Sequence, residues 1–276
     1  MESDVQRPLR QSLAGRVAVV TGGSGVLGGA MAAGLAESGA RVAVLGRRRD
    51  AAEARAEELR ASGGDARAIV ADVLDGTALR AARDELIAAW GRIDVLVNAA
   101  GGNVQRARTD GVLPFGMPMD AFDEVVRLNL HGTVAPSLVF GEAMAAAGRG
   151  SIGNISSMAA MQAMSGVLGY SVAKAAVDNA TCCLAVDLAR RCGPGLRVNA
   201  IAPGFFLADQ NRAVLVHPDG SYTERARSVI ARTPMGRFGE PAELVGALLF
   251  LASDAASFVT GVVLPVDGGF SAFSGV

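Results

Sequence analysis

Short apolar runs recur along the chain and alternate with longer stretches whose apolar positions follow a helical period. Runs of this length without polar interruption are typical of strands covered on both faces. Alternation of such strands with helices favours a parallel sheet. The pattern therefore predicts an α/β fold, a single-domain Rossmann-type doubly wound parallel sheet of about seven strands with helices on both faces. The predicted strands are residues 16–21, 41–45, 66–71, 93–97, 150–157, 196–202 and 262–266.

The remaining segments give the domain limits. Residues 1–13 are polar and charged, and we expect a disordered or loosely ordered tail there, with one domain over residues 14–276. Residues 205–237 show little regular pattern apart from a turn at 217–220. A structureless stretch of this length inside a compact domain usually serves binding. We therefore expect a substrate lid over about residues 204–238.

Polar residues and glycines follow the predicted strands, at the sheet edge where doubly wound folds bind ligands. Thr21, Asp72, Asn98 and Ser157 each end such a strand. The glycine-rich residues 22–28 lie between a strand and a helix, which is the context of a phosphate-binding loop. A tight turn without a ligand is the alternative interpretation of these glycines.

Arginines stand where many dinucleotide folds carry an acidic residue for the adenine ribose. Gly46, Arg47, Arg48 and Arg49 follow the second predicted strand. Guanidinium groups pair well with a 2′-phosphate, so the sequence favours NADP over NAD as cofactor. A solvated loop of charges is the alternative.

Tyr170 and Lys174 are the strongest candidates for chemistry. They are four residues apart in an alanine-rich helical segment, so both side chains lie on one helix face. A cation near a phenol lowers the pKa of the phenol and suits it to acid–base catalysis. Ser157, thirteen residues before Tyr170, could hold a carbonyl oxygen beside it. Asn129, among apolar residues of a predicted long helix, is either solvent-facing or has a specific task.

Composition narrows the classes of function. The formal net charge is −1 and no long basic run occurs, which argues against a nucleic-acid or membrane-surface partner. No apolar run reaches the length of about 18 residues that a transmembrane helix needs. Three cysteines, two of them adjacent, indicate reduced thiols in a cytoplasmic protein rather than a disulfide framework.

With these motifs assembled, the chain resembles a short-chain dehydrogenase/reductase over essentially residues 14–270. The resemblance implies that Tyr170 is the acid/base, Ser157 polarises the substrate oxygen, Lys174 binds the nicotinamide ribose, and Asn129 holds a water of the proton relay. The sequence departs from the family pattern at Val26, where a glycine is usual in the glycine-rich loop. The implied cofactor-binding residues are Thr21, Gly22, Ser24, Gly25, Val26, Leu27, Gly28, Arg47, Arg48, Asp72, Val73, Asn98, Ala99, Ala100, Gly101, Tyr170, Lys174, Pro203 and Gly204.

Within that family, residues 98–103, 202–206, 210–212, 233–239 and 268–275 are similar to the D-mannonate oxidoreductases of the short-chain type, also called fructuronate reductases. This likeness implies a D-fructuronate/D-mannonate substrate, and the wider family resemblance implies a homo-oligomer, a tetramer or dimer. Arg212 is the expected ligand of the substrate carboxylate, and a surface arginine or one that ties the lid to the body is the alternative. A ketogluconate reductase and a 3-oxoacyl-thioester reductase remain alternatives, and a non-catalytic dinucleotide sensor is a distant one. The expected substrate-binding residues are Asn103, Ser157, Met158, Asn211 and Arg212.

Overall fold

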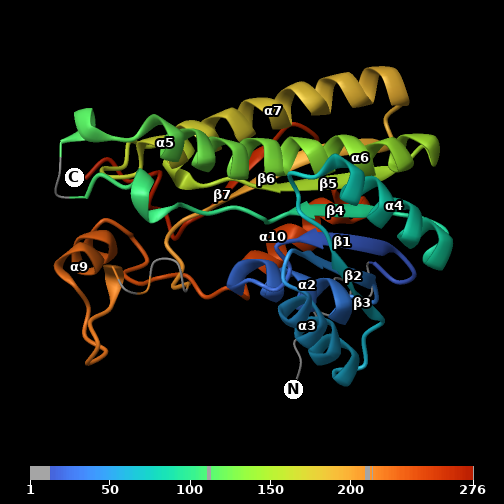
Figure 1. Cartoon of the computed structure of the whole chain (residues 1–276), viewed down its shortest axis with the longest axis horizontal. Helices are drawn as coiled ribbons and strands as arrows, with labels where there is room; N and C mark the ends of the chain where they lie inside the picture. Colours follow the sequence, from blue (N-terminus) through green and yellow to red (C-terminus); the bar gives the residue numbers. More distant parts are fainter. Residues whose placement is uncertain (1–12, 111–112, 209–211, 213, 276) are drawn as a thin grey trace.

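The computed structural model describes residues 13–110, 113–208, 212 and 214–275. Its centre is a seven-stranded sheet in the order β3-β2-β1-β4-β5-β6-β7, in which every neighbouring pair is parallel (Figure 1). The predicted fold class is confirmed. The strands are β1 (Val17–Thr21), β2 (Arg41–Gly46), β3 (Ala66–Val70), β4 (Val95–Asn98), β5 (Gly150–Ile155), β6 (Leu196–Pro203) and β7 (Val263–Val266).

Helices cover both faces of the sheet (Figure 1). One face carries α2 (Val26–Glu37), α3 (Arg49–Ala61) and α10 (Glu243–Ala252), which bury apolar side chains against alternate positions of the strands. The other face carries α4 (Gly76–Trp90), α6 (Gly132–Ala146) and α7 (Leu168–Cys192), which enclose a second core. Strand residues buried on both sides explain the uninterrupted apolar runs in the sequence.

Helix α2 can lie close to α10 because Gly34 has no side chain. A Cβ atom at Gly34 would come within 2.3 Å of Val245 Cγ1, far inside van der Waals contact. Leu35 on α2 and Leu248 on α10 are buried in the same core. Small residues along α2 therefore set the spacing of these two helices.

A buried carboxylate joins β1 to the segment before β4. Asp94 is 3 % exposed, and its Oδ2 accepts a hydrogen bond from the backbone N of Val17 at 2.9 Å. Arg149 Nη2 lies 3.4 Å from Asp94 Oδ1, and Arg92 also pairs with that oxygen. The two cations compensate the buried charge, so the start of the two central strands is fixed in register.

The structure differs from the sequence prediction in three places. The helix predicted through Asn129 is divided into α5 (Met119–Val126), a π-helical turn (Arg127–His131) and α6. Leu13, expected in the loose tail, is fully buried, and its backbone N donates to Ser38 O. The stretch expected to be irregular contains α9 (Glu224–Ala231), which stands to one side of the sheet in Figure 1.

Four short 3-10 turns complete the described elements: Gln105–Ala107, Pro114–Gly116, Met158–Ala160 and Asp254–Ala256. The first two interrupt the loop that follows β4, and the third follows β5 at the edge where the site lies. Among the described residues, no helix combines the length and the apolar character needed to cross a bilayer.

Candidate active site

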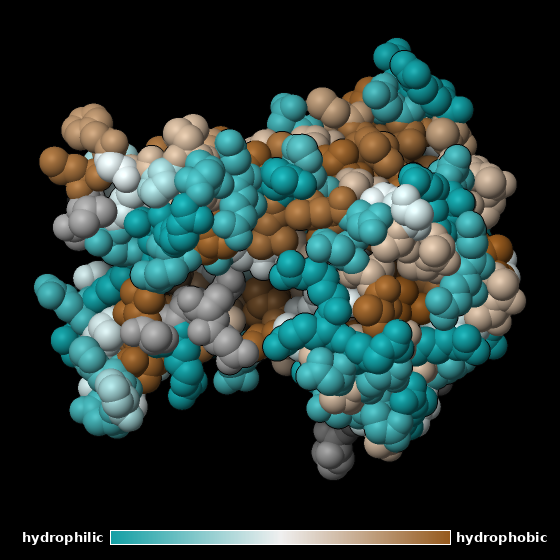
Figure 2. Space-filling view, in the orientation of Figure 1, coloured by the Kyte–Doolittle hydropathy of each residue, from teal (hydrophilic) through white to brown (hydrophobic). Residues whose placement is uncertain are grey.

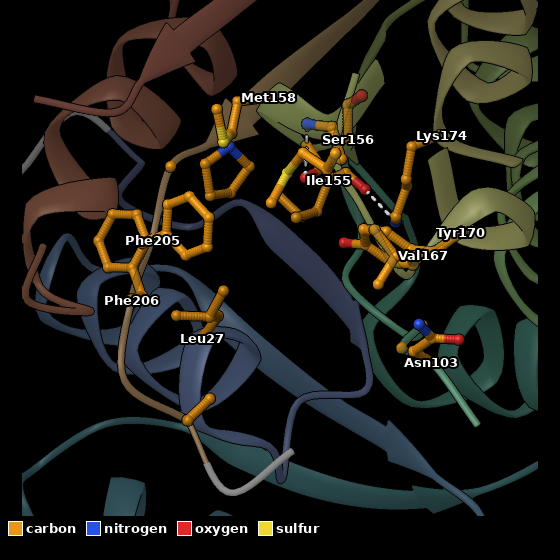
Figure 3. Close-up of a pocket in the computed structure, with 18 of the residues that line it drawn as sticks. Leu27, Asn103, Ile155, Ser156, Met158, Val167, Tyr170, Lys174, Phe205 and Phe206 are labelled. Carbon is orange, nitrogen blue, oxygen red and sulfur yellow. Dashed lines mark hydrogen bonds between the residues drawn. The ribbon is translucent and has the colours of Figure 1, made fainter. Parts of the chain in front are cut away.

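The carboxyl ends of β4, β5 and β6 open into one cavity of about 200 Å³. Tyr170, Lys174 and Val167 lie on one side of it, and Phe205, Phe206 and Leu27 lie across from them (Figure 3). On the face drawn in Figure 2 the molecule is hollowed between α9 and the sheet. The cavity therefore lies where the sequence predicted a ligand site, with part of its wall supplied by the predicted lid.

Ser157, Tyr170 and Lys174 meet at the wall of this cavity. Lys174 is 4 % exposed, and its Nζ donates to the backbone O of Ile155 at 2.7 Å. The same Nζ lies 5.6 Å from the ring centroid of Tyr170. Ser157 Oγ accepts from the backbone N of Ala159 at 3.1 Å and caps the turn that follows β5. A strand end, a capped turn and a helix thus bring the three side chains together.

The protonation properties of Tyr170 differ from the sequence prediction. Burial raises the pKa of the Tyr170 phenol above its usual value, and hydrogen bonding with Ser157 opposes this rise. The expected net lowering is wrong for this geometry, because desolvation of the phenolate dominates. Tyr170 consequently holds its proton at neutral pH.

Burial changes the pKa of Lys174 in the opposite direction to that of Tyr170. Desolvation of the ammonium lowers the pKa of Lys174 to about 8, and the charge of Asp178 partly opposes this. Asp178 is one helical turn further along α7, and burial raises the pKa of its carboxyl, whereas Ser156 and Lys174 lower it. Asp178 was not singled out from the sequence, although its spacing of four residues from Lys174 is a usable signal.

Asn129 has a specific task rather than a solvent-facing position. It is fully buried in the π-helical turn. Its Nδ2 donates to Gly102 O at 2.7 Å and to Val125 O at 2.9 Å, and its Oδ1 accepts from Gly102 N at 3.0 Å. Isolated π-turns inside helices are frequent at functional sites. Here the turn places an amide that holds the loop after β4 against the cavity.

The loop between β1 and α2 fits a dinucleotide phosphate. Gly22 has φ +64°, and a Cβ there would lie 2.9 Å from the backbone of Ala100. At Gly28 a Cβ would lie 2.3 Å from Gly22 O. The first turn of α2 contains no acidic residue, and its N-cap Gly25 makes no side-chain cap. Backbone N–H groups at such a helix start suit an anion.

The substitution at Val26 causes no strain. Val26 is the first residue of α2, and no non-glycine residue in the described part of the protein has a positive φ. A glycine is therefore not needed at this position for the backbone path. Ser24 lies close to the end of β2, since a Cβ on Gly46 would be 3.6 Å from Ser24 Oγ.

Arg47 and Arg48 are exposed at the end of β2, beside the phosphate loop. Arg47 Nη1 lies 3.9 Å from Asp72 Oδ2, a weak ion pair with both side chains open to solvent. Asp72 Oδ1 accepts from Leu74 N at 2.9 Å and so shapes the turn after β3. An exposed guanidinium at this position is free to bind a phosphate.

The other predicted cofactor residues have distinct positions. Asn98 turns its side chain into a buried network, where Nδ2 donates to Ser137 Oγ and to Asn154 Oδ1, both at 2.8 Å. Val73 is buried in the core beside α4 and α6. Ala100 N donates to the buried Thr21 Oγ1 at 3.2 Å, which joins the ends of β1 and β4. Cavity-lining positions are held by Leu27, Ala99, Gly101, Pro203 and Gly204.

The predicted substrate residues separate into two groups. Asn103 and Met158 line the cavity with Ser157. Arg212 is exposed and does not belong to the cavity lining, and Asn211 lies outside the described residues.

The guanidinium in the lining is that of Arg225, on α9, which the sequence reasoning missed because it expected no helix there. A cap at Thr223 followed by an acidic first turn was an available signal for that helix.

Comparison with known sequences identifies relatives along almost the whole chain. Residues 24–271 match the family model described as enoyl-(acyl carrier protein) reductase. An uncharacterised oxidoreductase of Bacillus subtilis, UxuB, is 46 % identical, with 98 % of this chain and 99 % of the relative covered. The D-threitol dehydrogenase of Mycolicibacterium smegmatis is 35 % identical, with 94 % of each chain covered.

Solved structures agree with these relatives. A Haemophilus influenza structure with bound NAD, provisionally assigned as a D-mannonate oxidoreductase, has a TM-score of 0.92 and 40 % identity, covering 98 % of this chain and 100 % of that one. A gluconate 5-dehydrogenase of Burkholderia cenocepacia, in complex with NADP and tartrate, has a TM-score of 0.83 and 36 % identity, covering 96 % and 98 %. With this coverage and the Ser157, Tyr170 and Lys174 geometry, the chain belongs to the short-chain dehydrogenase/reductase family.

Proposed function

We propose that the protein is an NAD(P)-dependent oxidoreductase that transfers a hydride between a nicotinamide and a ketone or secondary alcohol of a sugar acid. The observation that carries the proposal is the meeting of Ser157, Tyr170 and Lys174 at one cavity wall, beside a glycine loop that fits a dinucleotide phosphate. Family membership and the nicotinamide cofactors of the solved neighbours support it.

The cofactor would be held by groups at the ends of β1 and β2 and on α7. The loop 22–28 and the start of α2 suit the pyrophosphate, and Lys174 suits the nicotinamide ribose. When bound, the nicotinamide supplies or accepts the hydride. We propose NADP as the preferred cofactor, because Arg47 and Arg48 offer guanidinium groups at the end of β2 and no carboxylate replaces them.

The proton is exchanged at the Tyr170 hydroxyl. A phenol whose pKa is raised by burial is protonated at neutral pH and can donate to the oxygen of a ketone. Ser157 borders the same cavity and can donate a second hydrogen bond to that oxygen. Polarisation of a carbonyl by hydroxyl donors in a water-poor site favours hydride addition to its carbon.

A sugar acid is the substrate class that the lining favours. The cavity is bordered by two cationic side chains, Lys174 and Arg225, and its described lining has no carboxylate. Asn103 and Ser157 offer hydrogen bonds to hydroxyl groups. Similarity to the provisional D-mannonate oxidoreductase makes D-mannonate/D-fructuronate the first candidate pair, and likeness to gluconate 5-dehydrogenase makes ketogluconate the next.

A 3-oxoacyl thioester is the second candidate substrate, because much of the wall is apolar. Phe205, Phe206 and Leu215 come from the segment after β6, and Met158 and Met164 from the segment after β5. A fatty acyl group would pack against such side chains. A sensor without catalysis is disfavoured, since all four residues of the catalytic set are present.

Cofactor turnover with a substrate panel tests these proposals. The purified protein is assayed by absorbance of the reduced nicotinamide, with NADP and NAD against D-mannonate, D-gluconate, galactitol and D-threitol, and with NADPH and NADH against an acetoacetyl thioester. We expect the highest kcat/KM for a sugar acid. Preference for the thioester would support the second candidate, and absence of turnover with every substrate would contradict both.

We also propose that the protein is a homo-oligomer, a tetramer or dimer. Large apolar side chains are exposed on α7 at Leu168, Val172 and Val186 and on α6 at Leu138, and Figure 2 shows a hydrophobic band over these helices. Contiguous apolar surface of this kind marks protein interfaces. Light scattering should give a multiple of the 28.1 kDa mass of one chain. The pair Val172→Glu and Val186→Glu should lower it, and a monomeric unaltered protein would contradict the proposal.

A further inference from the structure

Arg225 is placed to meet an anion at the rim of the cavity. The second cation of the lining, Lys174, is bound to Ile155 O beside Tyr170, at the reacting end of the site. Arg225 comes from α9, in the segment that forms the other wall. A substrate whose reacting carbon lies at Tyr170 therefore has its remaining atoms available to Arg225.

The guanidinium of Arg225 is held by two loops far away in sequence. Nη1 donates to Asp110 Oδ1 at 3.0 Å, and Nη2 donates to Ser165 O at 3.5 Å. Asp110 Oδ2 accepts from Arg108 Nε at 2.7 Å. Two guanidinium groups thus share one carboxylate, and the cluster retains one positive charge in excess.

Arg225 retains donors for a ligand. A guanidinium carries five N–H groups in a planar fork, and hydrogen bonds to described residues use one on Nη1 and one on Nη2. The side chain is 32 % exposed, so it is partly withdrawn from water but still open to the cavity. Such a fork can hold both oxygens of a carboxylate.

Helix α9 cannot rotate freely to remove Arg225 from this position. Thr223 caps the helix by accepting from Ala226 N at 3.2 Å. Ala226 and Val229 are buried in a small core with Leu215 and Phe238. The burial of the residue next to Arg225 fixes the direction in which Arg225 leaves the helix.

We propose that Arg225 binds the carboxylate of the substrate, with Asp110 and Arg108 as positioning residues that hold its guanidinium at the rim. This assignment rests on the proposed sugar-acid function and names the group that selects acids over neutral polyols. The excess positive charge of the cluster is balanced when the substrate carboxylate arrives.

The test is the variant Arg225→Met in the complete protein, with Arg227→Met as matched control. Arg227 is on the same helix, is exposed, and donates to Tyr222 O at 2.8 Å rather than lining the cavity. For Arg225→Met we expect KM for the preferred sugar acid to rise about tenfold to a hundredfold, the usual loss for a hydrogen bond to a charged group. KM for galactitol or D-threitol, and both constants of Arg227→Met, should stay near those of the unaltered protein.

Two further measurements keep the assignment open to refutation. Tartrate should inhibit competitively with the acid, and its inhibition constant should rise in Arg225→Met and Arg225→Lys but not in Arg227→Met. Arg225→Lys keeps the charge without the fork, and it carries the test if the methionine variant does not fold. Arg212→Met, the substitution at the arginine that the sequence favoured, should leave both constants unchanged.

The outcomes separate the two proposals. Acid turnover that Arg225→Met leaves untouched, or equal loss on acids and polyols, would overturn the carboxylate assignment alone. Turnover restricted to polyols or thioesters in the unaltered protein would overturn the sugar-acid function itself.

Discussion

Replacement of Lys174 by methionine should change how stability depends on pH. The unfolded chain keeps the Lys174 proton up to about pH 10.5, whereas the folded protein releases it near pH 8 because the ammonium is buried. Between these values the unfolded chain binds more protons, so the stability of the native protein rises with pH in this window. A shift of the Lys174 pKa from 10.5 to about 8 changes the unfolding free energy by a total of about 3 kcal/mol across this window. About 2 kcal/mol of it falls between pH 7 and pH 9.5.

The assay is urea unfolding of the cofactor-free protein and of Lys174→Met at pH 7, 8, 9 and 9.5, at one protein concentration. The difference in unfolding free energy between the two proteins removes the titrations that they share. We expect the native protein to gain about 2 kcal/mol relative to the variant over this range. A difference that stays constant with pH would show that Lys174 has an ordinary pKa and that the desolvation argument is wrong.

Three further substitutions test the site. Tyr170→Phe should lower kcat by roughly 10²–10⁴ without unfolding, because it removes the proton donor; turnover within about tenfold of the parent would contradict the role. Arg47→Asp should lower kcat/KM with NADP and improve NAD relative to it, and an unchanged ratio would make Arg47 a solvated charge only. Gly28→Ala should weaken cofactor binding, measured by quenching of nicotinamide fluorescence, since its Cβ would lie 2.3 Å from Gly22 O. Undiminished affinity would show that the loop shifts to accommodate the added methyl group at little cost in free energy.

The sheet and much of the site could be predicted because their signals are local. Strands such as Val17–Thr21 are buried on both faces and therefore read as apolar runs. Parallel register then places Thr21 beside Asn98, so strand-end residues converge without knowledge of side-chain packing. Tyr170 and Lys174 are one helical turn apart, which fixes their common face.

What could not be predicted depends on contacts between distant segments. The Arg225 guanidinium reaches Asp110, 115 residues away, and no periodicity of either segment indicates this pairing. Burial in the folded protein raises the pKa of Tyr170, and no local pattern indicates this burial, whereas the sequence shows only the neighbouring cation. Arg212 was favoured for its position after β6, but the chain turns it to solvent.

The segment that carries α9 leaves and rejoins the body of the protein at almost the same point. Gly239 N donates to Phe205 O at 2.9 Å, and Phe206 and Gly239 form a parallel bridge. The described residues between these two points thus form an insertion with adjacent ends and its own small core at Leu215, Ala226, Val229 and Phe238. Evolution can exchange, lengthen or shorten such an insertion without disturbing the sheet or α7. Substrate preference in relatives can therefore diverge through exchange of this one segment, while the residues for hydride transfer are retained.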